Sequence, residues 1–239
     1  MLGGSSLVLG AALAYLVQLP RRVTAGIMAF GCGVLISAVA YDLFLEGFEL
    51  ASFRPLVIGS LAGSLAYAGA NWLISRSARH RKRSGHQQTH ESEGGGLAIA
   101  VGALLDGVPE SVVLGVSLLQ GGGVSLAVLA AIFLSNLPEG LSSALGMQKA
   151  GRSKTYVFGL WGSIAVTTGL AAAAGAALLG NASPTLLASV SAVAAGGLLT
   201  MVTDTMIPEA VEGEGGLAGV LVLVGLLVAF GLSHSLVGT

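Results

Sequence analysis

Charged residues are scarce in this chain of 239 residues: Asp, Glu, Lys and Arg make up 10% of it, whereas 54% of the residues are hydrophobic. Soluble domains carry about 25% charged residues, so the composition excludes a water-soluble globule. A membrane-spanning helix needs about 20 predominantly apolar residues, and the apolar runs leave no room for a sizeable soluble domain. The sequence therefore predicts an all-α polytopic protein embedded in a lipid bilayer.

Cysteine occurs once, as Cys32 inside an apolar run. A single cysteine excludes an intrachain disulfide and a CxxC metal knuckle, and we expect it to be a small packing residue. A basic excess is also missing, because 11 Lys and Arg oppose 12 Asp and Glu. Phosphate backbones require a basic surface, so nucleic acid is not an expected partner.

Apolar runs separated by turn or charge signals predict eight spans. They cover residues 4–19, 23–50, 54–75, 96–119, 124–148, 155–180, 184–211 and 215–236. The one long polar segment, 76–95, cannot bury apolar surface and is expected to be a flexible loop. It divides a single transmembrane domain into residues 1–75, with three spans, and residues 96–239, with five.

Basic residues follow alternate spans. Of the 11 Lys and Arg, ten lie in the loops after the first, third and fifth spans, and only Arg54 lies in the opposite set. The positive-inside rule then places these three loops, including 76–95, in the cytoplasm. We therefore expect a multi-pass protein of the cell (inner) membrane with both termini outside.

Acidic residues lie inside the predicted spans, where Lys and Arg are missing. The seven are Asp42, Glu46, Asp106, Glu110, Glu139, Asp204 and Glu209. A charge at the bilayer centre costs about 2.5–3.5 kcal/mol, so these carboxylates must be protonated, hydrated or neutralised by bound cations. We interpret them as a cation pathway, and buried hydrogen-bonded contacts are the alternative interpretation.

Spacing singles out two spans as a candidate metal site. Asp106 and Glu110 are four residues apart, and Asn136 and Glu139 are three apart, so each pair shares a helix face. A proline precedes Glu110, Glu139 and Glu209; each proline frees a carbonyl oxygen one turn back, and transporters coordinate cations at such broken helices. The predicted oxygen-rich site comprises Asp106, Glu110, Ser135, Asn136 and Glu139, with Asp42, Glu46, Asp204 and Glu209 as candidate pathway acids.

Three histidines, His80, His86 and His90, lie in the polar segment. They are candidates for metal capture, although a solvated linker explains them equally well. His234 near the C-terminus is expected to be incidental. No permanently bound cofactor is predicted; Zn, Mn, Fe, Co or Cd would be the substrate.

Four stretches carry a resemblance to a known family: LPRRVTAGIMAFGCGVLISAVAYDLF, ALLDGVPESVVLG, SNLPEGLSSALGM and TDTMIPEAVEGE. At these residues the chain resembles the ZIP (Zrt/Irt-like) family of divalent-metal transporters, and specifically its bacterial GufA-like branch. The resemblance implies eight spans in a 3+2+3 arrangement, in which spans one to three and six to eight form an inverted repeat around the fourth and fifth. It also implies metal uptake toward the cytoplasm.

The family places its metal site between spans four and five, where the fourth carries the motif HNxPEG. Here Asp106 takes the His position and Gly107 the Asn position, whereas Glu110 is retained. In the fifth span Ser135 and Asn136 replace typical ligands, and Glu139, the glutamate able to bridge two metals, is retained. The family's sixth span often supplies an acid, but 156–179 contains none. These departures favour a single oxygen-rich site over a binuclear zinc site.

Other readings remain open. A transport-inactive homologue would act as a metal sensor or structural protein. An intramembrane aspartyl protease would use Asp42 and Asp106 as a dyad, although the glycine expected before the second aspartate is missing. The run GMQKAGRS lacks the Walker lysine, which Arg152 replaces, so no ATP site and no enzyme activity are expected. Gly59 and Gly63 form a GxxxG spacing, which suits tight packing inside the chain or a homodimer.

Overall fold

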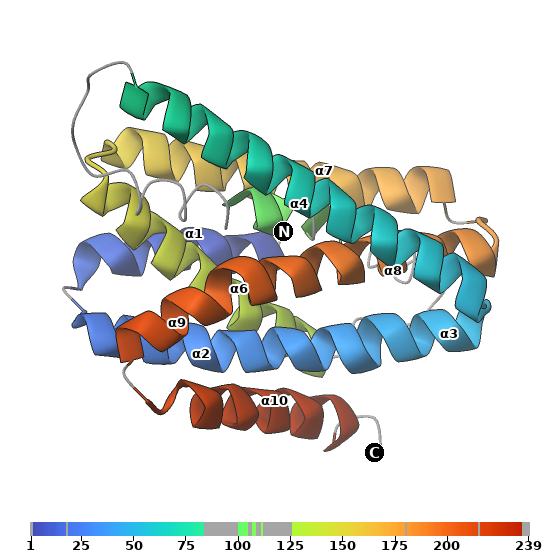
Figure 1. Ribbon diagram of the computed structural model, residues 1–239. Coiled ribbons are helices and arrows are strands. Elements are labelled where there is room, and N and C mark those ends of the chain that lie inside the picture. Colours follow the sequence, from blue (N-terminus) through green and yellow to red (C-terminus); the bar gives the residue numbers. More distant parts are fainter. Residues whose placement is uncertain are drawn as a thin grey trace.

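The structure is a computed structural model that describes residues 2–17, 19–83, 100–104, 107–108, 111, 126–179, 181–214 and 216–235. Within these residues every regular element is a helix, which confirms the all-α prediction. The elements are α1 (Leu2–Leu16), α2 (Arg21–Ser37), η1 (Ala38–Leu45), α3 (Glu46–Leu50), α4 (Phe53–Arg83), α6 (Leu126–Lys149), α7 (Lys154–Leu179), α8 (Pro184–Met201), η2 (Val202–Met206), α9 (Ile207–Glu214) and α10 (Ala218–Ser235). Figure 1 shows them as a bundle of roughly aligned helices.

Four of the described helices are long and apolar enough to cross a membrane. They cover Arg21–Leu50, Phe53–Leu73, Lys154–Leu178 and Pro184–Gly213, and shorter apolar helices cover Gly4–Leu16 and Ala218–Ser233. The first and last of the long helices are continuous through a π-helical segment, η1 or η2. The protein is therefore membrane-embedded. Most of the fourth predicted span, 96–119, lies outside the described residues.

Helix α4 continues beyond its expected end at residue 75 and reaches Arg83. The polar segment 76–95 thus begins as helix, contrary to the expectation of a loop. Ala, Arg and Lys are strong helix formers, and they let the helix continue past the apolar run. The guanidinium of Arg76 also lies 5.1 Å from the ring centroid of Trp72, one turn earlier. Residues 84–95 lie outside the described part.

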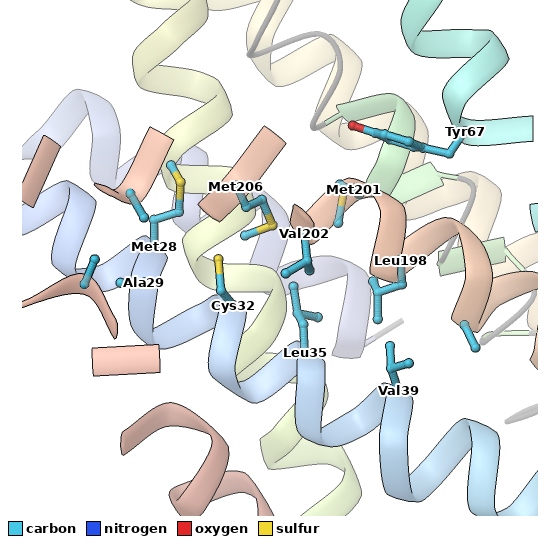
Figure 2. Packing of buried hydrophobic residues seen from close by; sticks show 13 residues of the cluster. Met28, Ala29, Cys32, Leu35, Val39, Tyr67, Leu198, Met201, Val202 and Met206 are labelled. Atoms are coloured by element: carbon cyan, nitrogen blue, oxygen red, sulfur yellow. The ribbon is translucent and has the colours of Figure 1, made fainter. Parts of the chain in front are cut away.

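In the described part of the chain, buried apolar side chains form two clusters, which we call cores. The α2/α8 core joins α2, α4, α8 and the segments around them, and includes Cys32, Tyr67 and Met206. Figure 2 shows its centre, where Leu35 and Val39 face Leu198 and Val202. The α1/α7 core joins α1, α6, α7 and the helical turn at 100–104; its members are Leu7, Ala11, Ala14, Ala100, Ala103, Leu141, Ala144, Met147, Val157, Trp161 and Ile164. The bundle therefore consists of two internally packed groups of helices.

Glycines bring three helix pairs into backbone contact. A Cβ on Gly63 of α4 would collide with the Val193 carbonyl of α8, and a Cβ on Gly196 would collide with the Ser60 carbonyl of α4. Reciprocal crossings of the same kind join α2 to α10 at Gly33 and Gly225, and α1 to α6 at Gly10 and Gly140. Lipid supplies no hydrophobic drive for helix association, so close backbone approach supplies the packing energy. The GxxxG of α4 is thus used inside the chain.

Most basic helix ends lie at one end of the bundle. The α1/α2 connection, the α6/α7 turn and the end of α4 lie together on the left in Figure 1, whereas the α3/α4 connection with Arg54 lies on the right. The side of the membrane on which each end of the bundle lies stays a prediction.

Adding one methyl group to Gly63 tests this packing. We expect Gly63→Ala to lower the free energy of unfolding by at least about 1–3 kcal/mol, the usual cost of overpacking, because its Cβ would meet the α8 backbone. The matched control is Gly69→Ala on the same helix, where a Cβ meets nothing within 4 Å. Thermal unfolding in detergent measures both variants. Equal stability of the two would contradict the crossing.

Candidate metal site

The structure describes part of the predicted site. Glu139 and Asn136 lie on α6 and are described with their side chains, whereas Ser135 is described by its backbone alone. Asp106 and Glu110 lie outside the described residues, so their placement beside Glu139 stays a prediction. Among the residues that are described, no three His, Cys, Asp or Glu side chains are grouped closely enough to hold a metal ion.

Glu139 is fully buried, with 0% of its surface exposed. It lies in the middle of α6 directly after Pro138, which is inside the helix as expected. The ring of Pro138 packs against Gly31 of α2, where a Cβ would come within 2.8 Å of two ring carbons. The missing side chain at Gly31 therefore lets α2 and α6 meet at the proline, and this contact sets the position of Glu139 between the two cores.

Cys32 follows Gly31 and is also fully buried. Its thiol interacts electrostatically with the carboxylates of Glu139 and Glu209, and Figure 2 shows its sulfur directed toward Met206. Cys32 packs in the core, as expected, but it also lies close to the acids, which composition and motif spacing did not indicate. A soft sulfur donor thus lies within electrostatic range of hard oxygen donors.

A hydrogen bond links the two cores beside Glu139. The hydroxyl of Ser142, one turn further along α6, donates to Oε1 of Glu209 on α9 at 3.3 Å. Ser142 itself is buried. This contact brings the fifth and seventh predicted spans together at their acids, and Ser142 is a residue that the motif analysis missed.

The intramembrane acids were expected to have no basic residue near them. Glu209 is an exception. It lies within electrostatic range of Lys149 at the end of α6 and of Arg21 at the start of α2. The reason is that α9 ends beside the start of α2, where Gly213 meets Arg21 and Ala25, and α6 ends at the same end of the bundle (Figure 1). Glu209 therefore belongs to the basic end of the bundle, whereas Glu139 lies deeper.

Two candidate pathway acids lie in π-helical segments. Asp42, half-buried, belongs to η1, and Asp204, exposed, belongs to η2. Single π turns inside α-helices are frequent at functional sites; η2 spans five residues, and η1 is longer, with eight. Pro208, which cannot donate a backbone hydrogen bond, follows η2 and accounts for its wider turn, but η1 contains no proline. Glu46, exposed at the start of α3, lies within electrostatic range of Asp42 and Glu49.

Polar pairs hold η2 and α8 against α4. The hydroxyls of Tyr67 and Thr205 form a hydrogen bond of 2.7 Å. One turn away, Thr200 donates to the hydroxyl of Ser64 at 2.7 Å. Tyr67 is completely buried and within electrostatic range of Glu139. The segment that carries Asp204 is therefore fixed to α4.

Helix α7, the sixth predicted span, presents a buried hydroxyl in place of an acid. Thr168 is 7% exposed, and its hydroxyl donates to the Ala165 carbonyl at 3.0 Å. A Cβ on Gly107 would lie 3.0 Å from the Thr168 methyl. Gly107 of the fourth-span motif therefore lies beside this part of α7.

The loop histidines are not tested by the structure. The backbone of His80 lies in the last turns of α4, without a described side chain, and His86 and His90 lie outside the described residues. Metal capture by these histidines stays a prediction.

Comparison with known proteins yields no relative: no family model and no curated protein matches the chain. The resemblance to metal transporters therefore depends on the residues and motifs alone.

Labelling of Cys32 tests the burial of this region. Because the thiol is the only one in the chain and 0% exposed, we expect a bulky maleimide to modify it only after denaturation. The control is Leu16→Cys in a Cys32→Ala background, because Leu16 is 79% exposed at the end of α1. Mass spectrometry reads the modification. Labelling of native Cys32 at the rate of the control would show that α2 and α6 are open at this point.

Proposed function

We propose that the protein carries divalent transition-metal cations across a cell membrane, with Zn, Mn, Fe, Co or Cd as its substrate. The observation that supports this proposal is the burial of Glu139, whose carboxylate is 0% exposed in the middle of a proline-containing helix. An ionisable residue at membrane depth is costly and marks substrate or ion pathways. A cation that binds there neutralises the carboxylate and offsets that cost.

The donor atoms proposed around Glu139 suit a metal that binds and is then released during transport. Asn136 lies one turn earlier on α6, and Pro138 removes the N–H that would bond to the Leu134 carbonyl. Asp106 and Glu110 are proposed to complete the site from the fourth span, as the resemblance implies. Carboxylate, amide and carbonyl oxygens favour Mn or Fe(II), whereas the nearby thiol of Cys32 extends the range toward Zn and Cd.

An internal repeat supports the proposed 3+2+3 arrangement. The helix of α2, η1 and α3 and the helix of α8, η2 and α9 share four positions at constant spacing: Gly33, Ser37, Val39 and Glu46 recur as Gly196, Thr200, Val202 and Glu209. Each helix has a π segment before its glutamate, and each uses its glycine to cross one neighbour, α10 or α4. The two helices run in opposite directions (Figure 1), as an inverted repeat requires.

The two cores provide a mechanism for alternating access. Glu139 belongs to α6 and is carried by the α1/α7 core, whereas Glu209 and Asp204 are carried by the α2/α8 core. Packed groups of helices move as rigid bodies more easily than they deform. We infer that displacement of one core against the other, with release of the Ser142–Glu209 hydrogen bond, exposes the site to each side in turn. Uptake toward the cytoplasm follows from the resemblance.

Metal flux into liposomes tests the proposal. We expect saturable uptake of at least one of Zn, Mn, Fe(II), Co and Cd, and we expect Glu139→Gln to reduce it at least about tenfold, as loss of a metal-site residue does. The matched control is Glu49→Gln, which removes an exposed carboxylate at the end of α3 and should leave flux unchanged.

Two results would contradict transport at this site. Undiminished flux through a folded Glu139→Gln protein would place the pathway elsewhere. Metal binding without flux of any metal would favour the transport-inactive sensor, and peptidase activity lost on Asp42→Ala would favour the protease.

A further inference from the structure

One face of α4 is exposed along the apolar part of the helix. The opposite face packs on α8 through Gly59 and Gly63. On the exposed face, Ile58, Leu61 and Leu65 are 59%, 59% and 71% exposed. Large exposed apolar surfaces mark sites of contact with a partner or a membrane, and in this membrane-embedded protein the face contacts the acyl chains of the lipid.

The same face continues past the apolar span. Trp72, which is 57% exposed, lies seven residues after Leu65. Three arginines follow it at spacings of four, three and four residues: Arg76, Arg79 and Arg83. Residues at such spacings share one face of a helix, and α4 is a continuous helix to Arg83. We name Arg76, Arg79 and Arg83 the α4 arginine stripe.

The length of α4 places this stripe at the membrane surface. The apolar part, Phe53–Leu73, is about 31 Å long at about 1.5 Å per residue, which matches the roughly 30 Å of the hydrocarbon core. Residues 74–83 of α4 add about 15 Å. This is more than one headgroup layer, which is about 5–7 Å thick. Helix α4 therefore crosses the headgroup layer before it ends.

The contact between Trp72 and Arg76 lies at the level of the headgroups. The guanidinium carbon of Arg76 is 5.1 Å from the centroid of the Trp72 ring. Trp is enriched at the boundary between membrane and water, and attraction to the ring face holds the guanidinium there. Figure 1 shows the end of α4 at the edge of the bundle, at the top left. The stripe therefore begins where the phosphates of the lipid lie.

The charge of this segment matches an anionic membrane surface. Residues 76–83 contain five Lys and Arg, and the chain has no Asp or Glu between Glu49 and Glu91. Clusters of about 4–8 basic residues directly after a span bind anionic lipid headgroups. We propose that the α4 arginine stripe binds the phosphate headgroups of anionic phospholipids, in the leaflet at the basic end of the bundle. This lipid site is independent of metal transport.

Native mass spectrometry of the intact chain tests the site. The probes are phosphatidylglycerol and phosphatidylcholine with the same acyl chains, and we expect preferential retention of phosphatidylglycerol. Arg79→Gln/Arg83→Gln should weaken phosphatidylglycerol binding about 30-fold, at about fivefold for each basic residue near the surface, and leave phosphatidylcholine binding unchanged. Should the double variant unfold, Arg79→Gln alone carries the test, with an expected loss of about fivefold.

The matched control is Arg81→Gln/Lys82→Gln. It removes the same number of charges from the same turns of α4, but these positions lie two and three residues after Arg79 and therefore off the stripe. We expect this variant to bind phosphatidylglycerol almost as tightly as the unmodified protein. Thermal unfolding of each variant in detergent verifies that all are folded.

Three results would overturn the proposal. Equal weakening by both double variants would indicate diffuse attraction to the basic segment and no defined face. Displacement of phosphatidylglycerol by inorganic phosphate would indicate a site for a water-soluble anion. Equal retention of the two lipids would show that the headgroup charge is not recognised.

Discussion

The contact between Gly31 and Pro138 is the constraint on which the rest of the structure depends. The proline ring needs the space that the glycine leaves free, and its position in the middle of α6 places the adjacent Glu139 between two separately packed cores. On the other helix the same contact places Cys32 next to the site. Packing of backbone and ring atoms thus keeps the Glu139 carboxylate fully buried between the two cores.

Tight packing and an internal boundary have different roles in this bundle. Reciprocal glycine crossings join α4 to α8, α2 to α10 and α1 to α6, and hydroxyl pairs reinforce the first of these. The α4/α8 and α2/α10 pairs lie in the α2/α8 core, and the α1/α6 pair lies in the α1/α7 core. The boundary between the cores carries the packing of Gly31 on Pro138 and a polar contact, from Ser142 to Glu209. Polar contacts of this kind exchange partners more readily than interlocked backbones, which suits a movement that carries Glu139 from one side to the other.

Much of the architecture could be predicted from the sequence because membrane thickness fixes span length and proline has one strong local effect. The apolar runs predicted the long helices, and Pro138 and Pro208 marked the middle of α6 and the end of η2. The π segment η1 was not predictable, because no proline or glycine cluster marks it. The electrostatic interaction of residues far apart in the chain, such as Cys32 and Glu139, depends on helix rotation and crossing. The periodicity of one strongly apolar chain does not specify these. The extension of α4 to Arg83 was not predicted, because the polar residues after position 75 were interpreted as a loop. For Asp106 and Glu110 the structure adds nothing to the prediction, because they lie outside the described residues.

The central claim is that Glu139 binds a transported cation. X-ray absorption spectroscopy of the protein loaded with Mn or Cd tests it most directly, because the spectrum reports the atoms that coordinate the metal. The account predicts stoichiometric binding with carboxylate oxygen ligands, lost in Glu139→Gln while the thermal stability of the protein is retained. Oxygen-ligated binding that persists in this variant, or a metal coordinated only by imidazole nitrogen from the histidines of the polar segment, would contradict it.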